Sequence, residues 1–478
     1  MPKASPKCIM IKSLFCMKIV FAILSFILTS ILSFAQNPSN NILTLEACTN
    51  LVKKNHPYAL QADIFVDRAK AELQRASGLF DPFAFTSIDQ KYFQEKNYFS
   101  NLNSGIGVQT TTGIGVNTGF NRSGGMFLNP EKNYPLQGLW TAGVSVPLGQ
   151  GLFIDDNRAA FKQAKIFNNN SSSQRQKLLN DLLFNAIKQY WSWSLSYNQY
   201  QVNQELYNLA KQRFEGIRES FLSGDRSALD TLESAIQMQT RKLQMEETRI
   251  NAQKEANDLS AFLWADSGEP IRLNENNAPE SLESKHIQAH IKRDSSIILQ
   301  HPELLLIGAR IADMQVQKKL AADKLKPRLN VLYNLQTPNE NQFVSSFNIN
   351  NYRWGLDFSM PLFLRRERGR LKSTQFQVQE IKLLEAQRKT EISNNLNFYD
   401  GLIANLNGQV AIARQIVAGS KILLDAEKTQ FDAGESSVFL INSRENTLAT
   451  NQIKLLEIQA KLQVANAGSH YVAGRLAE

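Results

Sequence analysis

The chain has 478 residues and carries 53 lysines and arginines against 44 aspartates and glutamates, a formal net charge of +9. Four of the lysines (Lys3, Lys7, Lys12 and Lys18) lie in an opening stretch without acids, so the remainder has an excess of 53−4−44, or 5, spread along its length. No basic block remains that would indicate a nucleic-acid-binding protein.

The first 35 residues predict a secretory signal peptide. Lys18 precedes an apolar run from Ile19 to Leu28, and the small-residue cleavage site Ser33-Phe34-Ala35 follows it. A membrane anchor is the alternative, but the apolar run is shorter than the ~20 residues that a spanning helix needs. We therefore expect residues 1–35 to be removed on export.

Removal of the signal peptide would leave Cys48 as the single cysteine, since Cys8 and Cys16 leave with it. No internal disulfide can then form. Cys48 follows Glu46-Ala47 inside a helical pattern rather than a lipidation motif, so we expect a buried structural cysteine.

The mature chain contains one unit twice. Residues 56–82 begin with His-Pro and end with proline, and so do residues 301–327, at a constant offset of 245 (301−56 and 327−82). A fixed offset is typical of an internal repeat. We expect a first repeat over 36–265, a linker over 266–298 and a second repeat over 299–478.

The first repeat reads as helices that flank alternating strands. Helices are predicted over 44–55 and 58–77, separated by His56-Pro57 because a residue before proline leaves helical geometry. Strands are predicted over 83–93 and 138–147, and segment 105–120 also alternates. A helix over 157–222 and a returning helix over 227–264 complete this repeat.

The second repeat has the same order of elements. Its strands are predicted over 329–336 and 352–360, and its helices over 368–431 and 438–476. At ~1.5 Å per residue the longest helix of each repeat would be about 100 Å long. Phe221-Leu222-Ser223-Gly224 and Phe431-Asp432-Ala433-Gly434 end these helices at equivalent positions.

The strands and helices predict two different surroundings. The strands alternate with aromatic residues on the apolar face, as lipid-facing barrel strands do, whereas the helices are too polar for lipid. We expect strands in a membrane and helices in water. Trp140, Tyr352 and Trp354 are predicted to form an interfacial aromatic belt, the alternative being that they pack between protomers.

The strand count predicts an oligomer. We count four crossings per chain and assign segment 105–120 to an external hairpin. An open four-stranded sheet has unpaired edges that lipid does not tolerate. Two copies would give about eight strands and a filled barrel, and three would give about twelve and an open lumen. We therefore predict a trimeric conduit with a 12-stranded barrel continued by a helical barrel.

The order of these motifs resembles the outer membrane efflux protein family, the TolC-like outer membrane factors. The resemblance covers nearly the whole mature chain and rests on short motifs that are weak singly and specific in their order. These are Leu45-Glu46-Ala47, Asn55-His56-Pro57, His301-Pro302, the strand ends Pro147-Leu148 and Pro361-Leu362, Tyr190-Trp191, and the Phe-x-x-Gly turns at 221–224 and 431–434.

The resemblance implies a trimer with a β-barrel in the outer membrane and an α-helical barrel in the periplasm. It further implies docking to a periplasmic adaptor (a membrane fusion protein) and an inner-membrane transporter. In that family the helix–turn–helix tips form the constricted entrance and meet the adaptor. The matching positions here are Phe221, Gly224, Phe431 and Gly434.

The resemblance also implies a gate at these tips, for which Asp230 and Glu233 are the matching acids of the first repeat. The second repeat departs from the family pattern: Leu440 and Ser443 stand where aspartates are expected, and Ser436 stands where a basic residue is expected. Glu435 and Arg444 are candidate substitutes. Asp230 and Glu233 are equally compatible with ordinary exposed acids.

The sequence argues against an enzyme. It shows no phosphate-binding glycine loop, no nucleophile motif and no zinc cluster, and we expect neither cofactor nor metal. His286 and His290 have the spacing of two zinc ligands, but Ile287 stands where a metalloprotease needs glutamate. The alternative function is a periplasmic coiled-coil adaptor or scaffold without a pore.

Overall fold

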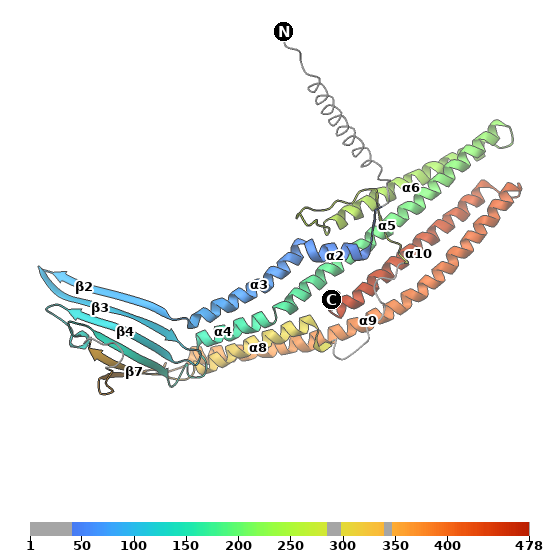
Figure 1. Cartoon of the computed structure of the whole chain (residues 1–478). Coiled ribbons are helices and arrows are strands. Elements are labelled where there is room, and N and C mark those ends of the chain that lie inside the picture. The colour runs from blue at the N-terminus through green and yellow to red at the C-terminus, as the bar shows by residue number, and fades with distance from the viewer. Residues whose placement is uncertain (1–40, 284–297, 339–346, 478) are drawn as a thin grey trace, which may run out of the picture. The chain divides into compact units, whose positions relative to one another are not determined.

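The computed structural model describes residues 41–283, 298–338 and 347–477 (Figure 1). The expected signal peptide and His286 and His290 lie outside these ranges. The chain divides into two compact units. We call Met1–Asn50, Gln189–His286 and Val410–Ala460 the hairpin unit, and Leu51–Lys188, Ile287–Gln409 and Lys461–Glu478 the sheet unit.

The sheet unit contains three shorter helices: α3 (Pro57–Ser77), α4 (Asp156–Asn169) and α8 (Pro302–Asp323). Helix α4 contacts both α3 and α8, so the three form one layer (Figure 1). This unit also holds the first parts of α5 (Ser171–Leu222) and α9 (Arg365–Asp432). The predicted helix over 157–222 is therefore two helices, α4 and α5, separated at Asn170.

Histidine N-caps begin the two equivalent helices α3 and α8. His56 and His301 are extended (φ −65° and −61°), and each Nδ1 accepts a hydrogen bond from the amide two residues later, at 3.1 and 3.2 Å. An N-cap acceptor satisfies an amide that the helix leaves unbonded, and proline at the next position has none to satisfy. The two His-Pro motifs are helix starts, as the sequence predicts.

The strands of the sheet unit form one six-stranded sheet with the order β2-β3-β4-β5-β7-β8. All neighbours are antiparallel. The strands are β2 (Phe83–Phe93), β3 (Lys96–Gln109), β4 (Gly115–Gly124), β5 (Leu139–Pro147), β7 (Arg328–Pro338) and β8 (Tyr352–Ser359).

The prediction of four strands per chain is wrong, because six strands of the described residues form one sheet. Segment 105–120 is not an external hairpin: it folds at Gly113 (φ +92°), and its halves join β3 and β4, which fill the sheet between β2 and β5. The first part of β3, residues 96–104, was not predicted, because asparagine or serine occupies five of these nine positions and this composition is typical of a loop. Pairing on both sides of β3 supplies the order that its composition does not predict.

The hairpin unit is built from antiparallel pairs of long helices. It contains α6 (Ala228–Ser260), the end of α5, the end of α9 and most of α10 (Val438–Val472). It also contains the start of α2 (Leu45–Asn55), whose first turn is capped by Thr44 Oγ1, and a two-stranded parallel sheet, β1 (Asn41–Leu43) with β6 (Asn277–Pro279).

Tyr190 fastens this small sheet to α5. Its hydroxyl donates to the carbonyl of Leu43 at 2.7 Å and accepts from the amide of Glu280 at 3.1 Å. The side chain is fully buried, and burial raises the pKa of the phenol well above its usual value. Cys48 is free and buried, as predicted; burial, followed by the charge of Glu280, raises the pKa of its thiol to about 12.

Candidate functional site

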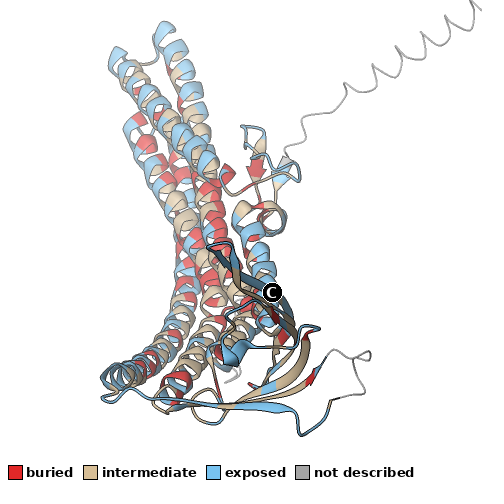
Figure 2. Cartoon of the chain, turned by 90° about the vertical axis from the view of Figure 1, so that its left-hand side faces the viewer, coloured by how far each residue is buried: buried red, intermediate tan, exposed pale blue. Residues whose placement is uncertain are grey.

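The six-stranded sheet has one apolar and one polar face. Because paired residues share a face, the register defines both. Figure 2 shows that the strands carry mostly intermediate and exposed residues, so neither face is covered within the chain. The apolar face carries Ile88, Ile106, Val108, Val116, Phe120, Trp140, Val144, Val146, Val331, Tyr333, Leu335, Tyr352, Trp354, Leu356 and Phe358.

The apolar face is exposed to a degree that a soluble surface seldom shows. Trp354 is 64% exposed, Phe358 66% and Ile88 72%. A contiguous apolar patch of this kind marks a contact with a membrane or a partner. Its alternation over whole strands is typical of lipid-facing barrel strands.

The polar face is lined mainly by asparagine, glycine and small hydroxyl residues. Asn103, Asn121, Thr141, Asn334 and Gln336 lie on it, with Arg353 and Asp357 on β8. Toward the end of β2 near η2 (Gly78–Phe80), Phe83 and Phe85 lie over glycines: a Cβ added to Gly107 or Gly105 would be 2.9 or 2.8 Å from the nearest ring atom. Glycine at these positions gives the aromatic rings room.

The predicted belt residues Trp140, Tyr352 and Trp354 all lie on the apolar face. The Trp140 ring lies 4.9 Å from that of Phe120, and Tyr352 stacks on Tyr333 at 5.6 Å. Trp354 is the register partner of Tyr333. The structure thus places these aromatic residues on one surface, and their position relative to a lipid boundary stays a prediction.

The two helix–turn–helix tips have the same backbone structure. Gly224 (φ +85°) and Gly434 (φ +81°) each donate a 3.0 Å hydrogen bond to the carbonyl of the phenylalanine three residues earlier, Phe221 or Phe431. A positive φ at a helix end favours glycine. The two tips meet, since the Arg226 guanidinium lies 4.7 Å from the centre of the Phe431 ring.

The predicted gate residues have differing surroundings in the chain. Asp230 forms a capping box with Ser227, in which each side chain bonds the other residue's backbone amide. Arg444 Nε lies 3.4 Å from Glu427 Oε2, and the other oxygen of Glu427 accepts from Ser436 at 2.5 Å. Glu435 is exposed at the tip, and Glu233 lines a groove described below. Asp230 and Arg444 therefore have structural partners within the chain, whatever their role in gating.

A buried charged cluster below the tips was missed from the sequence. Arg213 on α5 forms an ion pair with Glu445 on α10 and donates to Asn442 Oδ1 at 2.8 Å. Arg241 on α6 donates to Asn446 Oδ1 at 2.9 Å, and burial lowers the pKa of its guanidinium despite the charge of Glu445. The side chains of Arg213 and Glu445 are 14% and 2% exposed. The cluster ties three helices together, and no spacing in the sequence indicates it.

A groove between α6 and α10 lies beside the tips. Its volume is about 1,040 Å³, and it is bordered by exposed apolar residues and lined by polar ones. Leu229, Leu232, Ile236 and Phe439 are 58–73% exposed. Asn442, Ser443, Asn446 and Thr450 contribute the polar lining. An exposed apolar border of this kind suits an amphipathic helix from another protein.

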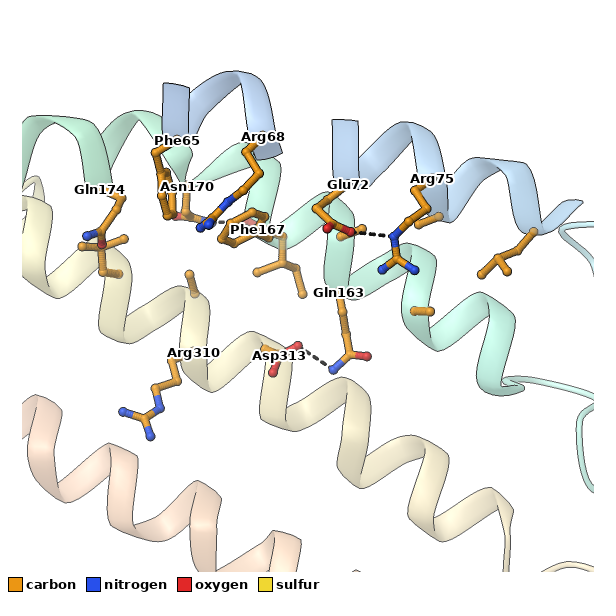
Figure 3. A pocket seen from close by; sticks show the side chains of 17 residues that line it. Phe65, Arg68, Glu72, Arg75, Gln163, Phe167, Asn170, Gln174, Arg310 and Asp313 are labelled. Carbon is orange, nitrogen blue, oxygen red and sulfur yellow. Dashed lines mark hydrogen bonds and ion pairs between the residues drawn. The ribbon is translucent and has the colours of Figure 1, made fainter. Parts of the chain in front are cut away.

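A second groove, of about 790 Å³, lies in the sheet unit between α3, α4 and α8 (Figure 3). Gln163 donates to Asp313 at 2.7 Å, and Arg75 pairs with Glu72 at 2.8 Å. Arg68 lies over the Phe65 ring at 4.9 Å. These partners satisfy the named polar side chains locally, and Leu79, Ile166 and Leu306 add apolar lining to the groove.

The described residues contain no cluster of potential metal ligands. Within 41–283, 298–338 and 347–477, no three histidine, cysteine, aspartate or glutamate side chains gather as metal ligands would. None of the helices in these ranges has the length and apolar character needed to cross a membrane.

Part of the chain resembles a known protein family in sequence. Residues 295–468 match the sequence model of the family described as outer membrane efflux protein. No curated protein gives a significant match.

Solved structures resemble the chain over most of its length at low sequence identity. The CmeC outer membrane channel of Campylobacter jejuni has a TM-score of 0.64 at 14% identity, covering 92% of this chain and 86% of that chain. VceC of Vibrio cholerae has 0.62 at 14%, covering 90% and 96%. The open state of the MtrE channel of Neisseria gonorrhoeae has 0.65 at 11%, covering 90% and 89%. These likenesses establish the fold.

Proposed function

We propose that this chain, whose residues 295–468 match the model of the outer membrane efflux protein family, belongs to that family and forms the outer-membrane channel of a tripartite efflux or type I secretion system. It is a passive exit duct rather than a pore-less scaffold. The family is one of transport ducts and not of enzymes.

The observation that carries this proposal is the amphipathic sheet. One face is apolar and exposed over whole strands, and the other is lined by asparagine, glycine and hydroxyl groups. Such a sheet suits lipid on one side and water on the other. Trp140, Tyr352 and Trp354 lie on the apolar face, where they would meet the lipid boundary as an aromatic belt.

A single chain supplies only part of the barrel wall. Its strands form an open sheet, and lipid does not tolerate unpaired strand edges. Copies of the chain must therefore share the wall, and the likeness to the outer membrane efflux protein family leads us to propose a homotrimer in which the strands close into a barrel and the long helices into a periplasmic tube. The repeats over 36–265 and 299–478, joined by residues 266–298, would then each contribute strands and helices to both parts, after removal of residues 1–35.

The groove beside the tips is the proposed docking site for a periplasmic adaptor. Its exposed border residues, Leu232 and Phe439 among them, offer apolar area to a helical hairpin of the adaptor. Phe221, Gly224, Phe431 and Gly434 set the shape of the tips next to it. Asp230, Glu233, Glu435 and Arg444 are the proposed gate residues, and the adaptor links the duct to an inner-membrane transporter.

Conductance in a planar lipid bilayer tests the proposal. Protein purified from outer membranes in detergent should produce discrete ion-conducting steps, whereas a pore-less scaffold would produce none. Adaptor docking is tested in cells with a photo-crosslinking amino acid at Leu232, which should form an adduct whose peptides identify a periplasmic adaptor. The control is Leu243, equally exposed on α6 (62%) but outside the groove; adducts to the same protein from both positions would contradict docking at the groove.

A further inference from the structure

The first two turns of α9 are strongly basic. Residues 365–372 contain one acid, Glu367, and five exposed cations: Arg365, Arg366, Arg368, Arg370 and Lys372. Glu367 pairs with Arg366 at 3.0 Å, and the other four cations form no ion pair with another described residue. The segment therefore has an excess of positive charge that the described chain does not balance.

This charge opposes the helix dipole. The N-terminus of a helix carries a partial positive charge, which favours acidic side chains and bound anions and disfavours cations. Three other helices follow this rule, since the first turn of α4 contains Asp156, that of α6 Asp230 and that of α8 Glu303. At the start of α9 the side-chain cations and the dipole have the same sign. An anion from outside the chain would be stabilised by both.

The basic segment directly follows the apolar face of the sheet (Figure 1). Phe358 lies on that face near the end of β8, and beyond the strand Leu362 and Phe363 are 92% and 73% exposed. Leu364 then has a φ of +48°, a region that leucine seldom occupies. The chain thus holds a strained turn that leaves two large apolar side chains uncovered. The lipid that covers the strand would cover them too.

The cations begin at the depth of lipid headgroups. The headgroup layer on each side of a bilayer is about 5–8 Å thick, and at ~1.5 Å per residue the segment 365–372 extends over about 12 Å. Even where α9 runs straight away from the membrane, its first turns lie within or next to this layer. The Arg365 guanidinium lies 5.4 Å from the centre of the Phe363 ring, so this cation is beside the apolar turn.

Three of the cations lie on one side of the helix. Arg365, Arg368 and Lys372 have the spacing i, i+3 and i+7, which places them within about 60° of one another; we call them the basic stripe. Gly369 borders the stripe, and a Cβ built on it would meet nothing within 4 Å. Glycine weakens a helix interior, and packing within the chain does not require it here. Its missing side chain leaves room for a phosphate oxygen to approach the helix between the cations.

The opposite side of the same turns is also basic. Arg366 and Arg370 line a cavity of about 630 Å³ together with Lys324 and Arg328, and Glu367 is the acid in this lining. The positive potential therefore surrounds the start of α9 and is not limited to the basic stripe.

The corresponding junction of the first repeat lacks this charge. Asp155 caps α4 and Asp156 follows it. Arg158 is buried and pairs with Asp155 at 2.9 Å. The two repeats thus differ in charge at the same place in the fold, and one chain offers one basic junction.

Resting on the proposed outer-membrane channel, we infer that the start of α9 binds an anionic phospholipid of the leaflet that faces the periplasm. The basic stripe holds the phosphate, and the helix dipole adds to the attraction. Leu362 and Phe363 contact the lipid beside the headgroup. Basic segments that directly follow a membrane-embedded element attract anionic lipids in this way.

Lipid binding by the purified protein tests the inference. Protein extracted from outer membranes in detergent is titrated with phosphatidylglycerol, or with the zwitterionic phosphatidylcholine of the same acyl chains, and bound lipids are counted by native mass spectrometry. We expect phosphatidylglycerol to bind at least tenfold more tightly. Each cation near the surface strengthens such binding about fivefold, so the variant Arg365→Gln, Arg368→Gln and Lys372→Gln should lose about 100-fold. Its binding of phosphatidylcholine, as a check of the fold, should not change.

A matched control removes the same charge elsewhere on the helix. In Lys382→Gln, Lys389→Gln and Lys421→Gln, three exposed lysines further along α9 are replaced, and phosphatidylglycerol binding should change less than threefold. Equal affinity for the two lipids, or the same loss in both triple variants, would overturn the inference. So would inorganic phosphate binding as tightly as phosphatidylglycerol, since the site would then be one for a free anion.

Crosslinking in cells separates lipid from a second copy of the chain as the occupant. A photo-crosslinking amino acid at Phe363 should form an adduct with the mass of a phospholipid, whereas an adduct with another copy alone would overturn the inference. Bilayer conductance separates the two proposals. A protein that conducts but shows no lipid preference overturns only the lipid site, and one that prefers phosphatidylglycerol without conducting overturns the channel and supports the site.

Discussion

Replacement of Glu445 by glutamine isolates the contribution of the buried cluster that joins α5, α6 and α10. Glu445 is the acid between Arg213 and Arg241, and its side chain is 2% exposed. Glutamine keeps the shape and one acceptor but leaves two arginines without a compensating charge. Removal of one partner of a buried pair costs about 3–5 kcal/mol. Arg213 is 14% exposed, so solvent relieves part of this, and we expect about 3 kcal/mol.

Native-state hydrogen exchange measures this cost, because opening of the helices near the cluster exposes their amides. A loss of about 3 kcal/mol corresponds to roughly 100-fold faster exchange at residues 441–449. The control is Glu435→Gln, at an exposed tip position, which should change exchange by less than threefold. In the double variant Arg213→Gln and Glu445→Gln, part of the loss should be recovered, since the excess charge is removed. Unchanged exchange in Glu445→Gln would refute the reasoning.

Three further predictions concern other parts of the chain. Tyr190→Phe removes the hydrogen bonds to Leu43 and Glu280, each costing about 1–3 kcal/mol if its partner is left buried, and should speed alkylation of Cys48; an unchanged rate would contradict this. His301→Ala should cost about 1 kcal/mol at neutral pH, whereas His301→Asn keeps a cap. Burial lowers the pKa of His301, although the charge of Glu303 opposes this shift. The contribution of His301 to stability is therefore full above about pH 6.5 and falls as the pH drops below that value. The melting temperature of the wild type should fall between pH 7.5 and 5, and the part of this fall that is due to His301 should be missing in His301→Asn. In vesicles with brominated lipid tails, variants retaining only Trp140 or Trp354 should lose most of their fluorescence, and a variant retaining only buried Trp191 should not; equal quenching would contradict the lipid-facing assignment.

Features with a local cause could be predicted from the sequence. The His-Pro helix starts, the prolines at the strand ends and the glycines of the two tips each act through their own backbone. For this reason the ends of α3, β2 and β8 lie within one residue of the predicted positions. Because the two repeats are related by a constant offset of 245 residues, the elements predicted in one repeat could be assigned in the same order in the other.

Features that depend on distant partners could not be predicted. The strand β3 is polar over 96–104 and is ordered by β2 and β4 on its two sides, so its composition alone indicated a loop. Arg213, Arg241 and Glu445 come from three helices, and nothing in their separate neighbourhoods marks them as one cluster. Asp230 shows that one local pattern can fit two roles. Its position three residues after Ser227 is that of a capping-box residue, and it also matches the position of a gate acid.

The central claim is that the open sheet of one chain becomes a pore wall only when copies share it. Native mass spectrometry of the protein extracted from outer membranes tests this most directly. The account predicts a complex of three mature chains that requires detergent to stay in solution. A single chain that remains soluble and folded after the detergent is removed would contradict it.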